Sequence, residues 1–200
     1  VEVVDTYLRR IEALNPRLNA FLTVTAEEAM QSAREAERAL GRDGDLPPLH
    51  GVPIAVKDLE ETRGIRTTYG SLVYEDFVPD EDSIIVERLR RAGAIILGKC
   101  HTTEFAYFHP SPARNPHHIA HTPGGSSSGS AVGVAARVFP AALGSQTAGS
   151  VVRPAAFNAA VGFKPTFGRI SRLGVIPHAQ SFDHVGVLTR TVADAGLPFK

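Results

Sequence analysis

Two short apolar segments separated by a helical segment constrain the fold more than any other feature of the sequence. Residues 52–56 (VPIAV) lead into Lys57, and residues 94–97 (AIIL) form the second apolar segment. Between them, residues 84–92 predict a helix that Ser83 caps. A strand, a helix and a second strand in this order predict two parallel strands joined by a crossover. The sequence therefore indicates an α/β fold.

The remaining elements fall into two groups along the chain. Helices predicted over 3–14 and 26–40 form an N-terminal helical layer, residues 1–45, in which Asn15-Pro16 ends the first helix. Residues 46–200 form the second group, the core. Its other predicted elements are a small-residue helix at 131–138, a second small-residue segment at 151–160, and strands at 141–144, 161–163 and 186–188.

Composition excludes several classes of protein. Among 200 residues, 21 Lys and Arg balance 21 Asp and Glu, so the excess positive charge of a nucleic-acid-binding protein is missing. No apolar run approaches the roughly 20 residues of a membrane span. The single cysteine, Cys100, cannot form an internal disulfide, so the fold needs no oxidising compartment. We expect a cytoplasmic protein that binds neither nucleic acid nor membrane.

Both ends of the sequence have the composition of an interrupted chain. The first residues (VEVVD) contain no Met and begin within a helical pattern, and a helix starting near Thr191 is stopped by Gly196 and Pro198. We therefore expect a fragment of a longer protein, and the missing signal peptide says little about localisation.

The run Gly124–Ser130 (GGSSSGS) is either a flexible linker or a turn that builds a site. It leads directly into the predicted small-residue helix, which favours a site. A phosphate-binding P-loop is excluded because no Lys follows. Ser127 is the centre of a G-x-S-x-G match, with Asp183 and His184 as its candidate partners, but a nucleophile elbow requires a preceding strand that His117–Pro123 cannot form.

Histidines raise the possibility of a zinc site. His117, His118 and His121 lie close together in the sequence, but no HExxH motif is present and no second cysteine accompanies Cys100. Exposed loop histidines are the favoured interpretation, and we expect no metal.

Lys57 and Ser150 each allow a structural and a functional interpretation. Lys57 ends an apolar strand, where it either reaches water or is buried; burial would lower its pKa and make the neutral amine a usable base. Ser150 begins a helical segment, where it is either an N-cap or a nucleophile beside free backbone N–H groups.

These residues together resemble the amidase signature family of serine hydrolases. The matching stretches are 51–71 (GVPIAVKDLEETRGIRTTYGS) and 122–195, and the most specific segment runs from TPGGSSSGS to RISRLGVIP. Ser126 and Ser150 have the family's spacing. The resemblance implies an α/β/α sandwich around a mixed β-sheet, of which this chain is the N-terminal, catalytic part. It also implies no cofactor and no metal, a small-molecule amide substrate and, by expectation, a homodimer.

The resemblance also implies roles for individual residues. Lys57, Ser126 with a cis peptide bond, and nucleophilic Ser150 would form a Ser-cisSer-Lys triad. The resemblance further implies backbone oxyanion-hole donors from Thr147, Ala148 and Gly149, and substrate contacts from Arg153 and Ser128. The implied reaction is hydrolysis of a carboxylic amide through an acyl-enzyme. The alternative is a glutamine-handling component of a tRNA-dependent amidotransferase.

Some residues depart from the family's pattern. Gln146 stands where many members carry Asp, which removes a charge that could pair with Arg153, and Ala148 stands where Gly is common. The segment from Arg172 to Pro177 (RLGVIP) is closer to stand-alone amidases than to amidotransferase subunits. An arylacyl amide, a short dicarboxylic monoamide and an allophanate-like ureide all remain open as substrates.

Overall fold

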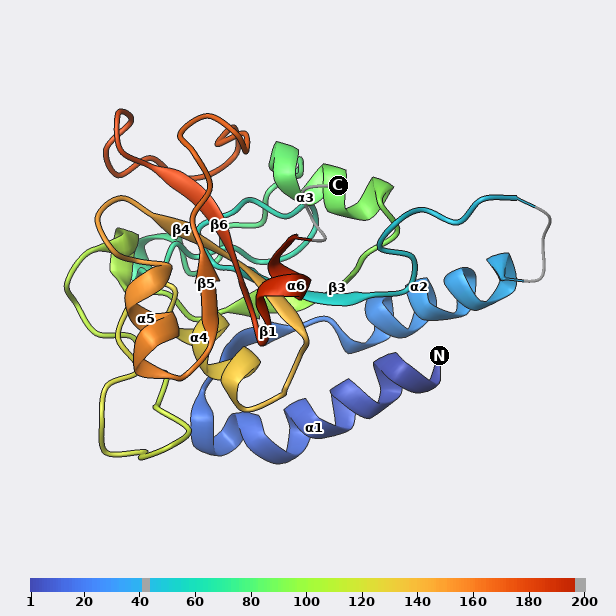
Figure 1. Ribbon diagram of the computed structural model, residues 1–200, viewed down its shortest axis with the longest axis horizontal. Helices are drawn as coiled ribbons and strands as arrows, with labels where there is room; N and C mark the ends of the chain where they lie inside the picture. The colour runs from blue at the N-terminus through green and yellow to red at the C-terminus, as the bar shows by residue number, and fades with distance from the viewer. Residues whose placement is uncertain (41–43, 197–200) are drawn as a thin grey trace.

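Figure 1 shows the computed structural model of the protein, which describes residues 1–40 and 44–196. In this part of the chain one mixed sheet has the strand order β1-β3-β2-β4-β6-β5. Its strands are β1 (Phe21–Val24), β2 (Pro53–Lys57), β3 (Ile95–Cys100), β4 (Ala141–Gln146), β5 (Val161–Phe163) and β6 (His184–Thr189). The α-helices are α1 (Glu2–Leu18), α2 (Ala26–Ala39), α3 (Ile84–Arg91), α4 (Ser128–Ala135), α5 (Val152–Phe157) and α6 (Val192–Gly196).

Strand β2 lies at the centre of the sheet and is parallel to both of its neighbours. It pairs with β3 and β4 in parallel, whereas β1, β5 and β6 add antiparallel pairs. This arrangement confirms the parallel pair expected from the strand–helix–strand order, and it confirms the mixed α/β class. Because β2 and β4 run in the same direction, Lys57 and Gln146 end at the same edge of the sheet.

Helices cover both faces of the sheet. Alternate side chains of β2 point to opposite faces, so Ala55 joins the core formed with α1, α2, α4 and α5, whereas Ile54 and Val56 join the core formed with α3 and α6. The α/β/α sandwich is thus confirmed. The division into a layer at 1–45 and a core at 46–200 stays a prediction.

Helix α1 does not end at Asn15-Pro16 as expected. It continues through Pro16 to Leu18, and Asn19 ends it in a left-handed conformation (φ 49°). The Asn15 side chain explains the continuation, because it accepts a hydrogen bond from the N–H of Phe21 (2.8 Å) and donates to the Phe21 carbonyl (3.1 Å). These bonds lead the chain into β1, a strand that the sequence pattern does not predict because it is only four residues long.

Two other helix boundaries differ from the sequence expectations. Helix α4 begins at Ser128 rather than Ala131, so the glycine–serine run enters the helix directly and is not a linker. Ser83 is the N-cap of α3, but its buried hydroxyl makes no cap bond. The first N–H of α3, that of Ile84, instead donates to the carbonyl of Leu173 (3.1 Å). Among the described helices, none has the length and apolar composition needed to cross a membrane.

We predict that Gly129→Ala destabilises the protein. A Cβ at Gly129 would lie 2.1 Å from the carbonyl oxygen of Ala20 and 2.6 Å from the backbone nitrogen of His101, neither of which can move freely. Overpacking of this kind costs about 2 kcal/mol or more, which thermal unfolding would detect as a lower Tm. Gly196→Ala is the control, since nothing lies within 4 Å of its added Cβ. Equal Tm values for the two variants would contradict the prediction.

Candidate active site

Lys57 is completely buried at the end of β2. Its Nζ donates to the Ser126 hydroxyl (2.7 Å), the Ser145 hydroxyl (2.9 Å) and the Ser145 carbonyl (3.3 Å). Burial lowers the pKa of Lys57 from 10.5 to about 7, because the charged form loses hydration. The negative charges of Glu60 and Asp183 oppose that shift. The lysine therefore does not reach water, and a neutral amine is accessible near neutral pH.

Ser126 follows a cis peptide bond from Gly125, in agreement with the cis peptide that the resemblance implies. Its carbonyl accepts hydrogen bonds from the N–H of Ser128 (2.8 Å), the hydroxyl of Thr102 (3.1 Å) and the N–H of Thr103 (3.2 Å). These contacts hold the turn between β3 and α4, and they leave the Ser126 hydroxyl directed at Lys57.

Arg153 and Ser128 also hold this turn. The Arg153 guanidinium donates to the Gly125 carbonyl through Nε (3.0 Å) and Nη2 (2.8 Å), and the Ser128 hydroxyl donates to the Gly124 carbonyl (2.8 Å). The expected substrate contacts of Arg153 and Ser128 stay predictions. The structure assigns both side chains a role in fixing the backbone around Ser126.

Ser150 lies between β4 and α5, next to the turn that carries Ser126. The N–H of Ser127 donates to the Ser150 carbonyl (3.1 Å), which joins the two segments directly. The N-cap of α5 is Val151, so Ser150 is not the cap residue. Within the described residues no hydrogen bond joins the hydroxyls of Ser150 and Ser126. One step of the expected hydrogen-bonded chain is therefore present, from Lys57 to Ser126, and the second step is not.

Gln146 fixes the loop that precedes Ser150. Its Oε1 accepts hydrogen bonds from the N–H groups of Val151 (2.9 Å) and Val152 (3.0 Å), and its Nε2 donates to the Ala148 carbonyl (3.1 Å). The side chain thus satisfies the start of α5 and ties it to the middle of the loop. Although Gln146 lacks the charge of Asp, it retains a capping function.

The N–H groups of residues 147–150 form a row of free donors. In the part of the chain that the structure describes, none of them donates a hydrogen bond to a protein acceptor. A succession of unpaired N–H groups in a turn attracts an anion. Their position beside the Ser150 hydroxyl makes this loop suited to stabilising a negatively charged oxygen.

The nucleophile-elbow hypothesis is wrong. Ser127 is fully buried, and its hydroxyl lies between the backbone N–H and carbonyl of Ser145 (both 3.3 Å). Its supposed partners are engaged elsewhere. Asp183 accepts hydrogen bonds from the Thr147 hydroxyl (2.5 Å) and from two backbone N–H groups, while His184 contacts the Phe182 carbonyl. No strand precedes Ser127 among the described residues 101–127.

The histidine cluster gives no metal site. The rings of His118 and His121 pack edge to face, and His117 contacts the Asn158 carbonyl (3.0 Å). Across residues 1–40 and 44–196, no group of three or more His, Cys, Asp or Glu side chains is placed to hold a metal ion. Cys100 is buried and free, and burial raises the pKa of its thiol.

Sequence reasoning missed three residues of the site, namely Ser145, Gln146 and Asp183. Two of them, Ser145 and Gln146, are polar residues at the end of an apolar strand (AALGSQ), which is a usable signal because such positions in a central strand are normally buried. Asp183 lies in an irregular segment, far from Lys57 in sequence, and carries no comparable signal.

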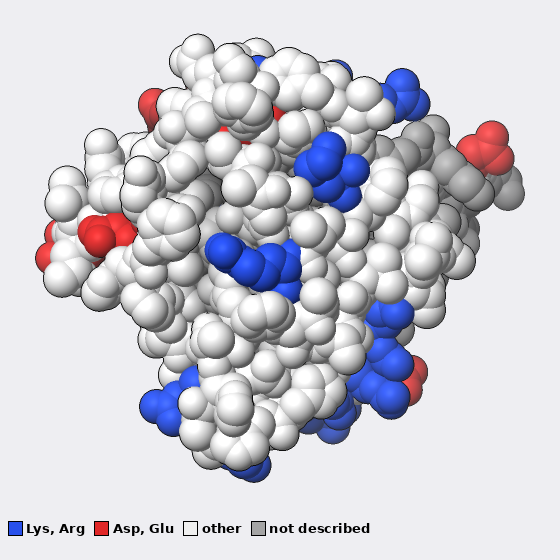
Figure 2. All heavy atoms as spheres, turned by 60° about the vertical axis from the view of Figure 1, so that its left-hand side comes forward, with Lys and Arg blue, Asp and Glu red and all other residues white. Residues whose placement is uncertain are grey.

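A cleft of about 490 Å³ adjoins the site and is open to solvent. Ser145 and Thr147 form its inner end, and Arg172, His178 and Asp183 lie along its wall. A smaller cleft of about 260 Å³ lies on the other side of the Ser126 turn and includes Arg153. The side of the molecule on which α5 lies is mostly uncharged, with a few Lys and Arg side chains near its centre (Figure 2).

Known proteins share this sequence and fold. The sequence matches the profile of the Amidase family over residues 2–200. It is 47% identical over 205 residues to a protein of Geobacter sp. (strain M21) that is named as the A component of glutamyl-tRNA(Gln) amidotransferase. That match covers 98% of this chain and 42% of the Geobacter protein.

Solved structures agree. The native peptide amidase from Stenotrophomonas maltophilia superimposes with a TM-score of 0.92 at 42% identity, over 99% of this chain and 43% of that one. The A component of glutamyl-tRNA(Gln) amidotransferase from Thermotoga maritima superimposes with a TM-score of 0.82 at 34% identity, over 98% of this chain and 42% of that one. The chain spans less than half the length of each of these relatives.

We predict that Lys57→Met stabilises the protein more at pH 7 than at pH 10. Between the folded pKa of about 7 and the ordinary value of 10.5, the unfolded chain binds a proton on Lys57 that the folded protein does not bind. The free energy of unfolding of the wild type therefore falls as the pH drops through this range, and it stays low below pH 7. Methionine takes no proton, so urea denaturation should show an advantage for the variant that grows from pH 10 to pH 7. A difference independent of pH would contradict the prediction.

Proposed function

The chain belongs to the amidase family, and we propose that it forms the catalytic part of a serine hydrolase that cleaves a carboxylic amide C–N bond through an acyl-enzyme. The observation that carries the proposal is the hydrogen bond from buried Lys57 to the Ser126 hydroxyl (2.7 Å), directly beside the segment of Ser150. A base, a relay hydroxyl and a nucleophile in this order match the requirements of acyl transfer.

The first half of the reaction forms the acyl-enzyme. The Ser150 Oγ attacks the amide carbon, its proton passes to the Ser126 hydroxyl, and the Ser126 proton passes to the neutral Lys57 amine. The negative charge that develops on the substrate oxygen is stabilised by the free N–H groups of residues 147–150. The C–N bond then breaks, and Lys57 returns the proton through Ser126 to the leaving nitrogen, which departs as ammonia or an amine.

The second half uses the same groups with water as the nucleophile. Water loses a proton to Lys57 through Ser126 and attacks the acyl ester, and the proton returns to the Ser150 oxygen as the carboxylate leaves. In apo structures such hydrogen bonds are often long and tighten only with substrate bound, which is consistent with the missing bond between the two hydroxyls.

A glutamine-handling component of a tRNA-dependent amidotransferase is the second candidate. The name of the relative from Geobacter sp. (strain M21) favours it, since that protein is 47% identical to this chain. The chemistry at Ser150 would be the same, with glutamine as the amide and ammonia passed on to a partner. A homodimer and a cytoplasmic location stay predictions for either candidate.

We predict that Ser150 is the residue that becomes covalently modified. The protein at its natural full length, treated with a fluorophosphonate and digested, should carry the label on the peptide containing Ser150. Lys57→Ala and Lys57→Arg should both slow labelling about 100-fold or more, because neither side chain can accept a proton. Ser181→Ala, at an exposed serine, should label at the wild-type rate. Labelling at another residue would contradict the proposed nucleophile.

We predict that the purified full-length protein acts without a partner. Ammonia release from an arylacyl amide, a short dicarboxylic monoamide, an allophanate-like ureide and glutamine should show turnover of at least one compound other than glutamine. Adding the partner subunits of an amidotransferase should leave that rate unchanged. Turnover of glutamine alone, and only with a co-purifying second protein, would instead establish the second candidate.

A further inference from the structure

Glu60 is a fully buried carboxyl group that the mechanism above does not use. Its side chain has no exposure to solvent, and within the described residues neither carboxyl oxygen has a hydrogen-bond partner. A buried ionised carboxylate without a partner is strongly unfavourable, so such a group must be neutral or must share its charge with a nearby cation.

The backbone places Glu60 next to Lys57. The N–H of Glu60 donates to the Lys57 carbonyl (3.1 Å), which closes a four-residue turn immediately after β2. The ends of such a turn lie within about 7 Å of each other at their Cα atoms. The Glu60 backbone is fixed in turn, because its carbonyl accepts hydrogen bonds from the Lys99 ammonium (2.6 Å) and the Thr62 hydroxyl (3.1 Å).

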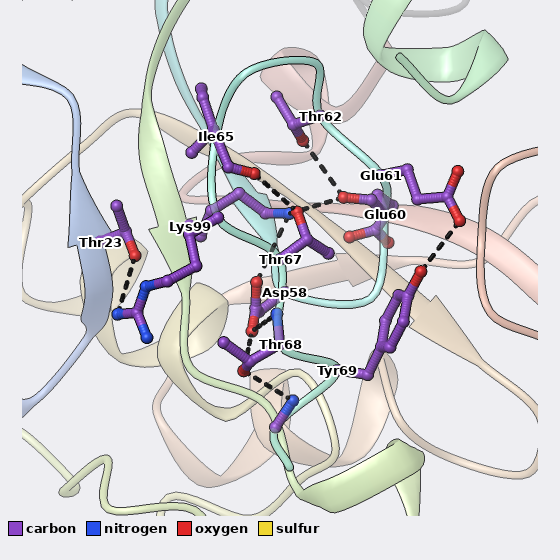
Figure 3. A network of polar contacts seen from close by, with 12 residues as sticks. Thr23, Asp58, Glu60, Glu61, Thr62, Ile65, Thr67, Thr68, Tyr69 and Lys99 are labelled. Atoms are coloured by element: carbon purple, nitrogen blue, oxygen red, sulfur yellow. Dashed lines mark hydrogen bonds and ion pairs between the residues drawn. The ribbon is translucent and has the colours of Figure 1, made fainter. Parts of the chain in front are cut away.

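The other buried charges of this region already have partners (Figure 3). Asp58 lies 3.5 Å from Lys99 and accepts hydrogen bonds from the N–H (3.0 Å) and hydroxyl (2.6 Å) of Thr68. Lys99 also donates to the Thr67 hydroxyl (2.6 Å). This leaves Lys57 and Glu60 as the second cation and the second anion of the cluster.

Two anionic groups act on Lys57, and they differ in their own contacts. Asp183 is held by the Thr147 hydroxyl and by the N–H groups of His178 and Ala179. Glu60 has no such donors, and its neighbours in the cluster are Lys57, Lys99 and Asp58. Burial raises the pKa of Glu60 to about 7, in the same range as that of Lys57. Glu60 is therefore the partner whose charge changes together with that of the amine.

We propose that Glu60 is a positioning residue for the reaction: at neutral pH it and Lys57 hold one proton between them, and its charge sets the pH above which the Lys57 amine is free to act as a base. The inference rests on the proposed function. The pair is either an ammonium with a carboxylate or an amine with a carboxylic acid, and both forms have no net charge. In the second form Lys57 accepts the proton from Ser126.

The test is the pH dependence of kcat/KM for Glu60→Gln in the full-length protein. Removing the carboxylate takes away a charge that stabilises the ammonium, so the pKa of Lys57 falls and the acid limb should move down by about 1 pH unit. Glu60→Asp keeps the charge and should leave the limb closer to its wild-type position. Glu61→Gln is the matched control, because Glu61 is the adjacent residue and its carboxylate is bound by the Tyr69 hydroxyl (2.9 Å); its acid limb should not move.

The outcomes separate the inference from the proposed function. An unchanged acid limb in Glu60→Gln, with Lys57→Ala inactive, would overturn the role of Glu60 and leave the hydrolase mechanism intact. Full activity of Lys57→Ala would overturn the mechanism itself. Glu60→Leu provides the same test if the glutamine variant does not fold, because it removes the carboxyl group without burying an unpaired polar atom.

Discussion

Burial of the Lys57 amine is the constraint on which the rest of the site depends. A lysine side chain enclosed at the end of a central strand loses its hydration, so every oxygen around it must be placed with care. Ser126 and Ser145 supply those oxygens from two different segments. The turn around Ser126 is in turn held by Thr102, Thr103 and Arg153. The arrangement sacrifices stability for a base that is neutral near pH 7.

Sheet topology explains how distant segments meet. Because β2 and β4 are parallel, their ends bring Lys57 and Ser145 to one edge, and the loops after β3 and β4 carry Ser126 and Ser150 to the same place. Small residues make this approach possible. Gly129 lets the start of α4 lie directly against the backbone of Ala20 and His101, so the Ser126 turn sits on the sheet edge rather than above it.

The parts of the structure that follow local rules could be predicted from the sequence. The parallel pair β2–β3, helix α2 and strands β5 and β6 lie where apolar patterning indicates them, whereas the pattern leaves Lys57 either solvated or buried and only the structure decides. Long-range contacts could not be predicted. The unpartnered Ser83 hydroxyl, the passage of α1 through Pro16 and the charges of Glu60 and Asp183 near Lys57 all depend on segments distant in sequence, which local propensity does not describe.

Gln146 has a consequence for how the site responds to acid and base. Its carboxamide caps α5 and grips the middle of the 147–150 loop with hydrogen bonds that involve no ionisable group. A carboxylate in the same place would change its hydrogen bonding as it gained a proton, whereas an amide does not. The anion-binding loop therefore keeps its shape across the pH range in which the Lys57 amine changes charge, so acidity switches the base of this site without reshaping its anion-binding half.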